Sequence, residues 1–290
     1  MKFLTDYEIH IFGMNRCGQH AILSWMLGMF EDVLFKNNMG AAEFKVDPVS
    51  MRPWPFYHYE NYGEKTSRKK WEVFAPGFEP NAIILGTENA YIDKFATNYN
   101  SIFNRKKIPE ILRKSNENGL EVDAFSKHRI FISVIRSPHN HAASCLKWRG
   151  LNHFINKSEN FIPLWKSYAK EHLGITDYLP EIAITLDYDK WFLDDNYRRE
   201  LFDQMNLDVE YSEKNLNKVL GFGKGSSFNR QASNGKANRM KVLNRWEYWM
   251  KEVSRDNLKF QRYLEMLNDD ELQDFSKQIY GEMPFIVKDM

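Results

Sequence analysis

A short loop near the N-terminus contains the residue types that bind phosphate. It reads Gly13-Met14-Asn15-Arg16-Cys17-Gly18-Gln19-His20 and lies between an apolar segment of strand character and an apolar segment with helical spacing. Backbone N–H groups in such a loop, with the N-terminus of a helix behind them, can surround phosphate oxygens. Arg16 adds a cation inside the loop. The pattern predicts an anion site, and the alternative is a plain strand-to-helix turn with Arg16 facing solvent.

The two glycines of this loop have the spacing found in the P-loop of nucleotide-hydrolysing proteins. In those proteins a Lys and a Ser or Thr follow the second glycine, whereas this chain has Gln19 and His20 there. The Lys binds the β- and γ-phosphates and the hydroxyl binds Mg²⁺, so their absence disfavours ordinary ATP or GTP hydrolysis. We therefore expect the residues from Asn15 to His20 to bind an anion without that chemistry.

A second pair of residues follows the strand predicted at 130–135. Arg136 stands at the end of this strand, and Ser144 comes eight residues later, in a helix that Pro138 is placed to begin. Ligands of open α/β sheets bind at the carboxyl ends of the strands, so Arg136 and Ser144 can meet one phosphate there. The alternative is structural, with a salt bridge for Arg136 and a helix-packing hydroxyl for Ser144.

With both motifs present in this order, the chain resembles the sulfotransferases that use 3′-phosphoadenosine 5′-phosphosulfate (PAPS). In that family a Lys-Ser-Gly or Arg-Ser-Gly core after the first strand binds the 5′-phosphosulfate. Arg16-Cys17-Gly18 matches this core, with Cys in place of the usual Ser. The family's 3′-phosphate motif is an Arg at a strand end with a Ser eight residues later, as in Arg136 and Ser144. The resemblance runs from about Ile9 to Lys241 without the middle insertion, and it implies PAPS as co-substrate with no metal ion.

A late glycine-rich loop closes over the nucleotide in the same family. The segment from Gly221 to Phe228 is similar to that loop. The resemblance implies phosphate contacts from Lys224 and from the backbone amides of Gly225 and Ser226. Taken alone, a segment this rich in Gly and Ser is also typical of a flexible linker.

Sulfuryl transfer also needs a base, because the attacking hydroxyl or amine must lose a proton. In several branches of the family the base lies just after the strand that precedes the 3′-phosphate strand, and Glu88 occupies that place. The resemblance therefore implies Glu88 as the base, with Arg16 at the transferred group. Glu43, after the second predicted strand, and His20, at the start of the first helix, are the alternatives. A strand-end salt bridge is the structural alternative for Glu88.

The elements that must position these residues are those of a single α/β domain with a mostly parallel sheet flanked by helices. Strands are predicted at 7–13, 33–36, 81–86, 130–135 and 182–186. Helices are predicted at 21–30, from Pro138, at 161–173, at 196–205, at 240–249 and at 269–280. The segment 38–80 is rich in prolines and aromatics and is predicted to be an irregular insertion that covers the acceptor site, and 236–290 a helical C-terminal part.

Composition restricts the class of partner. The chain has 40 Lys and Arg against 39 Asp and Glu, so the electrostatic signature of a nucleic-acid or membrane-surface protein is missing and any anion site must be local. No apolar run reaches the roughly 18–20 residues that span a bilayer. We expect the partners to be PAPS, or its product, and an acceptor whose identity the sequence does not encode.

The cysteines and histidines give no metal pattern. Cys17 and Cys145 form neither a disulfide framework nor a CxxC motif, which fits a reducing compartment. His139, His141 and His153 lack the spacing of a zinc site. The first residues do not resemble a signal peptide, and we therefore expect a cytoplasmic protein. The oligomeric state has no signal in the sequence.

Overall fold

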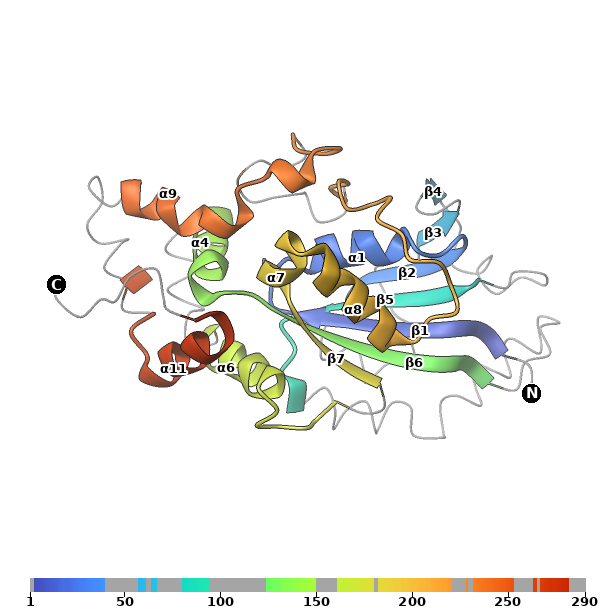
Figure 1. The fold of residues 1–290 in the computed structure, drawn as a ribbon, viewed down its shortest axis with the longest axis horizontal. Helices are drawn as coiled ribbons and strands as arrows, with labels where there is room; N and C mark the ends of the chain where they lie inside the picture. The colour runs from blue at the N-terminus through green and yellow to red at the C-terminus, as the bar shows by residue number, and fades with distance from the viewer. Residues whose placement is uncertain are drawn as a thin grey trace.

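The structure is a computed structural model of the chain. It describes residues 3–39, 57–60, 64–66, 80–93, 124–149, 161–179, 182–220, 228, 232–252, 263–264 and 267–281. Within these ranges the strands form one seven-stranded sheet in the order β4-β3-β2-β5-β1-β6-β7, with helices around it (Figure 1). The strands β2, β5, β1, β6 and β7 run parallel. This arrangement confirms the predicted α/β fold with a mostly parallel sheet.

The parallel strands coincide with the predicted apolar runs. They are β1 (Phe3–Gly13), β2 (Val33–Met39), β5 (Ala82–Glu88), β6 (Ala124–Ile135) and β7 (Ile182–Asp187). β1 lies between β5 and β6, and its last residue, Gly13, pairs with Glu88 on one side and Val134 on the other. β5, which carries Glu88, is thus a direct neighbour of β1 in the sheet.

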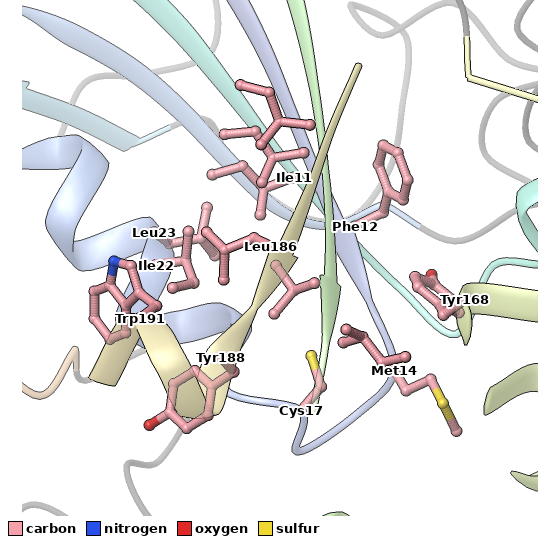
Figure 2. Packing of buried hydrophobic residues seen from close by; sticks show 14 of the residues in the cluster. Ile11, Phe12, Met14, Cys17, Ile22, Leu23, Tyr168, Leu186, Tyr188 and Trp191 are labelled. Carbon is pink, nitrogen blue, oxygen red and sulfur yellow. The ribbon is translucent and has the colours of Figure 1, made fainter. Parts of the chain in front are cut away.

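Both faces of the sheet are buried and largely apolar, although Glu8 and His10 of β1 are buried polar residues. Figure 2 shows Ile11 of β1 pointing towards Ile22 and Leu23, and Phe12 pointing to the opposite face, where Tyr168 lies. The rings of Phe12 and Tyr168 are 6.5 Å apart. Two layers of helices therefore hold the central strand, and its carboxyl end is fixed from both sides.

The predicted insertion contains regular structure. Residues Tyr57–Glu60 form β3 and Glu64–Thr66 form β4, which extend the sheet antiparallel from β2. This part of the prediction of an irregular segment is wrong. The aromatic residues of β3 favour a strand, but β3 and β4 are only four and three residues long, so the pattern alone did not show the pairing. The rest of the insertion lies outside the described residues.

The helices cover the sheet and extend beyond its carboxyl edge (Figure 1). They are α1 (Gln19–Leu27), α4 (Pro138–Arg149), α6 (Phe161–His172), α7 (Tyr188–Leu193), α8 (Asp195–Met205), α9 (Arg245–Glu252) and α11 (Asp270–Tyr280), with 3-10 turns η4 (Ala237–Arg239) and η5 (Val242–Asn244). In the described ranges, none of the helices is long and apolar enough to cross a membrane.

Two helical predictions need correction. The helix predicted at 240–249 is interrupted, because η4 and η5 precede α9, which begins only at Arg245. The short helix α7 was not predicted. It forms because the Asp187 carboxylate accepts hydrogen bonds from the backbone N–H groups of Asp189 and Lys190. The predicted terminal helix is confirmed as α11, with Leu272 buried on its inner face.

Candidate functional site

The loop between β1 and α1 needs its two glycines. A Cβ on Gly13 would lie 2.5 Å from the sulfur of Cys17, and a Cβ on Gly18 would lie 2.3 Å from the ring of Tyr188. Gly18 also has a φ of +106° and forms the N-cap of α1. Arg16 has a φ of +73°, which is uncommon for a residue with a side chain. The loop is therefore tightly curved, with α1 starting directly behind it.

Replacing Gly18 with alanine tests this fit. The left-handed backbone costs about 1–2 kcal/mol for an L-residue, and the clash with Tyr188 adds to it. We expect the free energy of unfolding to fall by about 2–3 kcal/mol in urea denaturation. Gly174→Ala is the matched control, because its φ is +68° and no atom lies within 4 Å of its Cβ position. An equal loss of unfolding free energy in both variants would mean that contact with the Tyr188 ring does not restrict residue 18.

The loop is held by neighbouring elements. The Asn15 N–H donates to Asn89 Oδ1 at 2.9 Å, and the Asn15 carbonyl accepts from His141 Nε2 at 2.8 Å. Burial lowers the pKa of His141 to about 3, so the imidazole is neutral and its one N–H donates to the loop. The Cys145 thiol also donates to the Asn15 carbonyl, at 3.4 Å. Asn15 therefore fixes the loop through its backbone.

The Gln19 side chain joins two strand ends. Its Nε2 donates to the carbonyls of Ile11, at 2.6 Å, and Thr87, at 2.9 Å. The residue is buried, although it contributes to the cavity wall described below. The side-chain nitrogen of Gln19 is therefore used in hydrogen bonds within the protein. Of the predicted anion contacts of Gln19, only the one from its backbone N–H fits this arrangement.

Cys17 points away from the anion position. Its side chain is 1% exposed and lies among core residues beneath the loop (Figure 2). Burial raises the pKa of its thiol to about 12, and its backbone N–H donates to the Met14 carbonyl at 3.1 Å. The thiol therefore packs against Gly13 instead of standing in for the hydroxyl of the family's serine.

Arg136 and Ser144 come together as the sequence predicted. Arg136 Nη1 donates to Ser144 Oγ at 3.0 Å, and Ser144 donates in turn to the Asn140 carbonyl at 2.8 Å. A third residue joins them, because Arg245 Nη1 donates to the same Ser144 Oγ at 2.9 Å. The Ser144 hydroxyl is fully buried between the two guanidinium groups.

The Arg136 guanidinium is also a structural junction. It is 1% exposed and donates to the backbone carbonyls of Arg16, at 3.1 Å, and Val242. Its Nε lies 3.8 Å from Asp189 Oδ1. Arg136 thus joins the loop between β1 and α1 to α4, η5 and α7, which is the structural role that the sequence offered as the alternative to an anion site.

The arginines concentrate positive charge at this edge of the sheet. Burial, together with the charges of Arg136 and Arg16, lowers the pKa of Arg245 to about 9. Such a shift means that the protonated guanidinium is costly where it stands. A bound anion would reduce that cost, since an opposite charge favours the protonated form.

Glu88 and His20 form a pair at the carboxyl edge of the sheet. Glu88 is the last residue of β5 and His20 is the second residue of α1. Glu88 Oε1 lies 3.4 Å from His20 Nε2, and the two side chains are 18% and 26% exposed. The structure therefore places together two residues that the sequence had offered as competing candidates for the base.

A cavity joins these groups. It encloses about 810 Å³, counting the part open to solvent. Its polar wall includes Arg16, His20, Glu88, Arg136, Lys218 and Arg245, and its apolar wall includes Tyr188, Trp191, Phe192, Leu216, Leu220 and Met240. The Arg16 guanidinium also lies 5.2 Å from the centre of the half-exposed Trp148 ring. Cationic and apolar side chains therefore line the same cavity.

Several predicted site residues cannot be placed. Glu43, Lys224, Gly225 and Ser226 lie outside the described residues. Two cavity cations, Arg245 and Lys218, were not predicted from the sequence. Neither follows a recognisable motif, so only the folded chain shows that they reach this site. The described ranges contain no group of three His, Cys, Asp or Glu side chains arranged to hold a metal ion.

Asp187 offers a test of the electrostatics behind Arg136. Burial, with the neighbouring charge of Asp189, raises the pKa of Asp187 from 3.8 to about 7. The folded state therefore keeps a proton that the unfolded chain releases near pH 4, and stability falls as the pH rises from about 4 to 7. Each pKa unit is worth about 1.4 kcal/mol, and the shift of about three units already includes the two backbone N–H donors that favour the anion, so we expect a loss of about 3–4 kcal/mol between pH 4 and pH 7.

The measurement is urea denaturation of wild type and Asp187→Asn across this pH range. The asparagine keeps an oxygen for the two N–H donors that cap α7. The difference in unfolding free energy between the two proteins should change by about 3–4 kcal/mol from pH 4 to pH 7. A pH-independent difference would show that Asp187 titrates normally.

Comparison with known proteins gives no identification: no protein-family model matches the chain, and no curated protein matches it.

Proposed function

We propose that this protein transfers a sulfuryl group from PAPS to a hydroxyl or amine of an acceptor. The observation that supports it most is the composition of the cavity. A glycine-bounded loop at a helix N-terminus and three arginines line it together with the Glu88–His20 pair. The first two features suit phosphate binding, and the third can take a proton from an acceptor.

The lining of the cavity supports one orientation of the proposed donor. The loop from Arg16 to His20 lies where the 5′-phosphosulfate would bind, with backbone N–H groups at the start of α1 as donors. The 3′-phosphate belongs near Arg245, Ser144 and Arg136, which already share hydrogen bonds. Direct contact between this phosphate and Arg136 Nη2 requires that the Val242 carbonyl leave its place. The apolar wall of the cavity suits the adenine ring.

The transfer is a displacement at sulfur. The acceptor oxygen or nitrogen forms a bond to sulfur while the bond from sulfur to the bridging phosphate oxygen breaks, and 3′-phosphoadenosine 5′-phosphate leaves. Glu88 takes the proton that the acceptor loses. Arg16 and the loop N–H groups stabilise the charge that develops on the bridging oxygen. Attack in line with the leaving oxygen requires the acceptor to enter between Glu88 and the loop.

The competing proposal of an unusual P-loop kinase receives less support. Gln19 stands at the position of the Walker lysine, and its Nε2 is bound to two backbone carbonyls of the sheet. Gln19 therefore has no positive charge, and its side chain points to the sheet and not to a nucleotide phosphate. A nucleotide-binding protein without catalytic activity keeps the same cavity, and only turnover distinguishes it from an enzyme.

Ligand selectivity tests the proposal. Thermal unfolding is followed with 3′-phosphoadenosine 5′-phosphate, AMP and ATP with Mg²⁺ at equal concentrations. A ligand at 100 times its Kd stabilises the folded state by about 2.7 kcal/mol. We expect the 3′-phosphorylated nucleotide to raise the Tm most. Equal shifts with AMP, or a larger shift with ATP and Mg²⁺, would contradict the proposal.

The proposed partners and location follow from the same reasoning. The balance of 40 basic against 39 acidic residues supports a nucleotide and a small or local acceptor group over a nucleic-acid polymer. Two free cysteines support a reducing, cytoplasmic compartment. Release of 3′-phosphoadenosine 5′-phosphate from PAPS, measured with a panel of hydroxyl and amine acceptors, distinguishes the enzyme from an inactive nucleotide-binding protein.

A further inference from the structure

The backbone segments that carry Glu88 and His20 are tied together on both sides of the pair. The Asn89 N–H donates to the Gly13 carbonyl, and Asn89 Oδ1 accepts from the Asn15 N–H, both at 2.9 Å. On the other side, Gln19 Nε2 donates to the Thr87 carbonyl at 2.9 Å. Thus the residues adjacent to Glu88 are bonded to the loop that leads to His20, and little backbone freedom remains between the two side chains.

The charges around the pair are unequal. Glu88 is the sole carboxylate among the described residues that line the cavity, which also contains Arg16, Arg136, Lys218 and Arg245. A carboxylate that shares a cavity with several cations is attracted towards them. The imidazole of His20, at 3.4 Å, competes for one carboxylate oxygen. A hydrogen bond from Nε2 to Oε1 leaves Oε2 for another partner.

We infer that His20 is a positioning residue that holds Glu88 in the orientation needed to take the acceptor's proton. The inference rests on the proposed function. His20 Nε2–H donates to Glu88 Oε1, and Oε2 receives the proton from the attacking hydroxyl, amine or water. Without His20 the carboxylate turns to the cationic wall, where it no longer meets the acceptor. His20 therefore acts through Glu88 and not as a phosphate ligand.

The first experiment measures the pair without turnover. The imidazole of His20 is titrated by NMR in wild type and in Glu88→Gln. If the two side chains interact, removing the carboxylate charge should lower the His20 pKa by about one unit, because the nearby anion favours the imidazolium. His128, which is exposed and stacks on Tyr7 at 5.6 Å, is the internal control and should not shift. An unchanged His20 titration would overturn the inference.

The second experiment measures the role of the pair. The probe is PAPS with water as acceptor, and release of sulfate is followed in His20→Ala and His20→Gln. We expect kcat to fall by about 10- to 100-fold in His20→Ala, within the range of a positioned base, with an unchanged KM for PAPS. His20→Gln, which keeps an N–H donor, should recover most of the rate. His20→Ala combined with Glu88→Gln should be no slower than Glu88→Gln alone.

The outcomes separate this inference from the proposed function. A raised KM for PAPS in His20→Ala, with unchanged kcat, would make His20 a phosphate ligand and overturn the positioning role. Additive losses in the double variant would do the same. If wild type neither binds 3′-phosphoadenosine 5′-phosphate selectively nor releases sulfate, the proposed function fails and the catalytic role of the pair fails with it. The NMR titration would still report whether the two side chains interact. His128→Gln should leave all rates unchanged.

Discussion

Replacing Arg136 with alanine is expected to lower the free energy of unfolding by about 3–5 kcal/mol, the cost of removing one partner from a buried charged network. The guanidinium donates to Ser144 and to the backbone carbonyls of Arg16 and Val242, and it is 1% exposed. Its removal takes this donor from the carbonyls of Arg16 and Val242, while Ser144 Oγ still accepts the hydrogen bond from Arg245. Urea denaturation of wild type and variant, both without nucleotide, measures the loss of unfolding free energy.

Arg199→Ala is the matched control for this variant. Arg199 is exposed and its guanidinium lies 4.6 Å from the ring of Tyr211, so its loss should cost less than about 1 kcal/mol. Arg136→Lys keeps the charge but not the forked donor geometry and should lie between the two. If Arg136→Ala were as stable as Arg199→Ala, Arg136 would be a ligand contact with no structural role.

Glu88→Gln is expected to slow sulfuryl transfer by about 10²- to 10⁴-fold, the contribution of a positioned base. The change keeps the size and a hydrogen-bonding oxygen of the side chain, so binding of 3′-phosphoadenosine 5′-phosphate should remain within about twofold of wild type. Release of this nucleotide from PAPS measures the rate, and calorimetry measures the binding.

Glu31→Gln controls for the loss of a negative charge, because Glu31 is an exposed residue that follows α1. It should leave the transfer rate unchanged. Full activity of Glu88→Gln would exclude Glu88 as the base and return the role to Glu43 or His20. Loss of nucleotide binding in the same variant would show that the carboxylate organises the loop instead of the acceptor.

The parts of the site that local sequence determines were predicted. The loop from Gly13 to Gly18 depends on glycine positions a few residues apart, and Arg136 with Ser144 depends on one strand end and the first turns of one helix. Burial of both faces made the parallel strands readable as apolar runs. The adjacency of β1 and β5 then placed Glu88 at the same edge.

The parts that depend on distant contacts were not predicted. Arg245 reaches Ser144 across 101 residues, and Arg136 reaches Val242 across 106. The inward direction of Cys17 follows from its contact with Gly13, not from its place in a motif. The break before α9 has the same origin, because the Val242 carbonyl accepts from Arg136, which follows β6, and the Leu243 carbonyl accepts from Asn140 of α4. Helical periodicity does not record such bonds.

The measurement that bears most directly on the proposed activity is calorimetric titration of the wild-type protein with two isomers. Adenosine 3′,5′-bisphosphate is the product of PAPS, and adenosine 2′,5′-bisphosphate has the same groups and charge with one phosphate moved. If the cation cluster of Arg245 and Arg136 recognises the 3′-phosphate, the first isomer should bind at least about 10-fold more tightly, a difference of about 1.4 kcal/mol. Equal affinity for the two isomers, or no binding of either, would contradict a PAPS site in this protein.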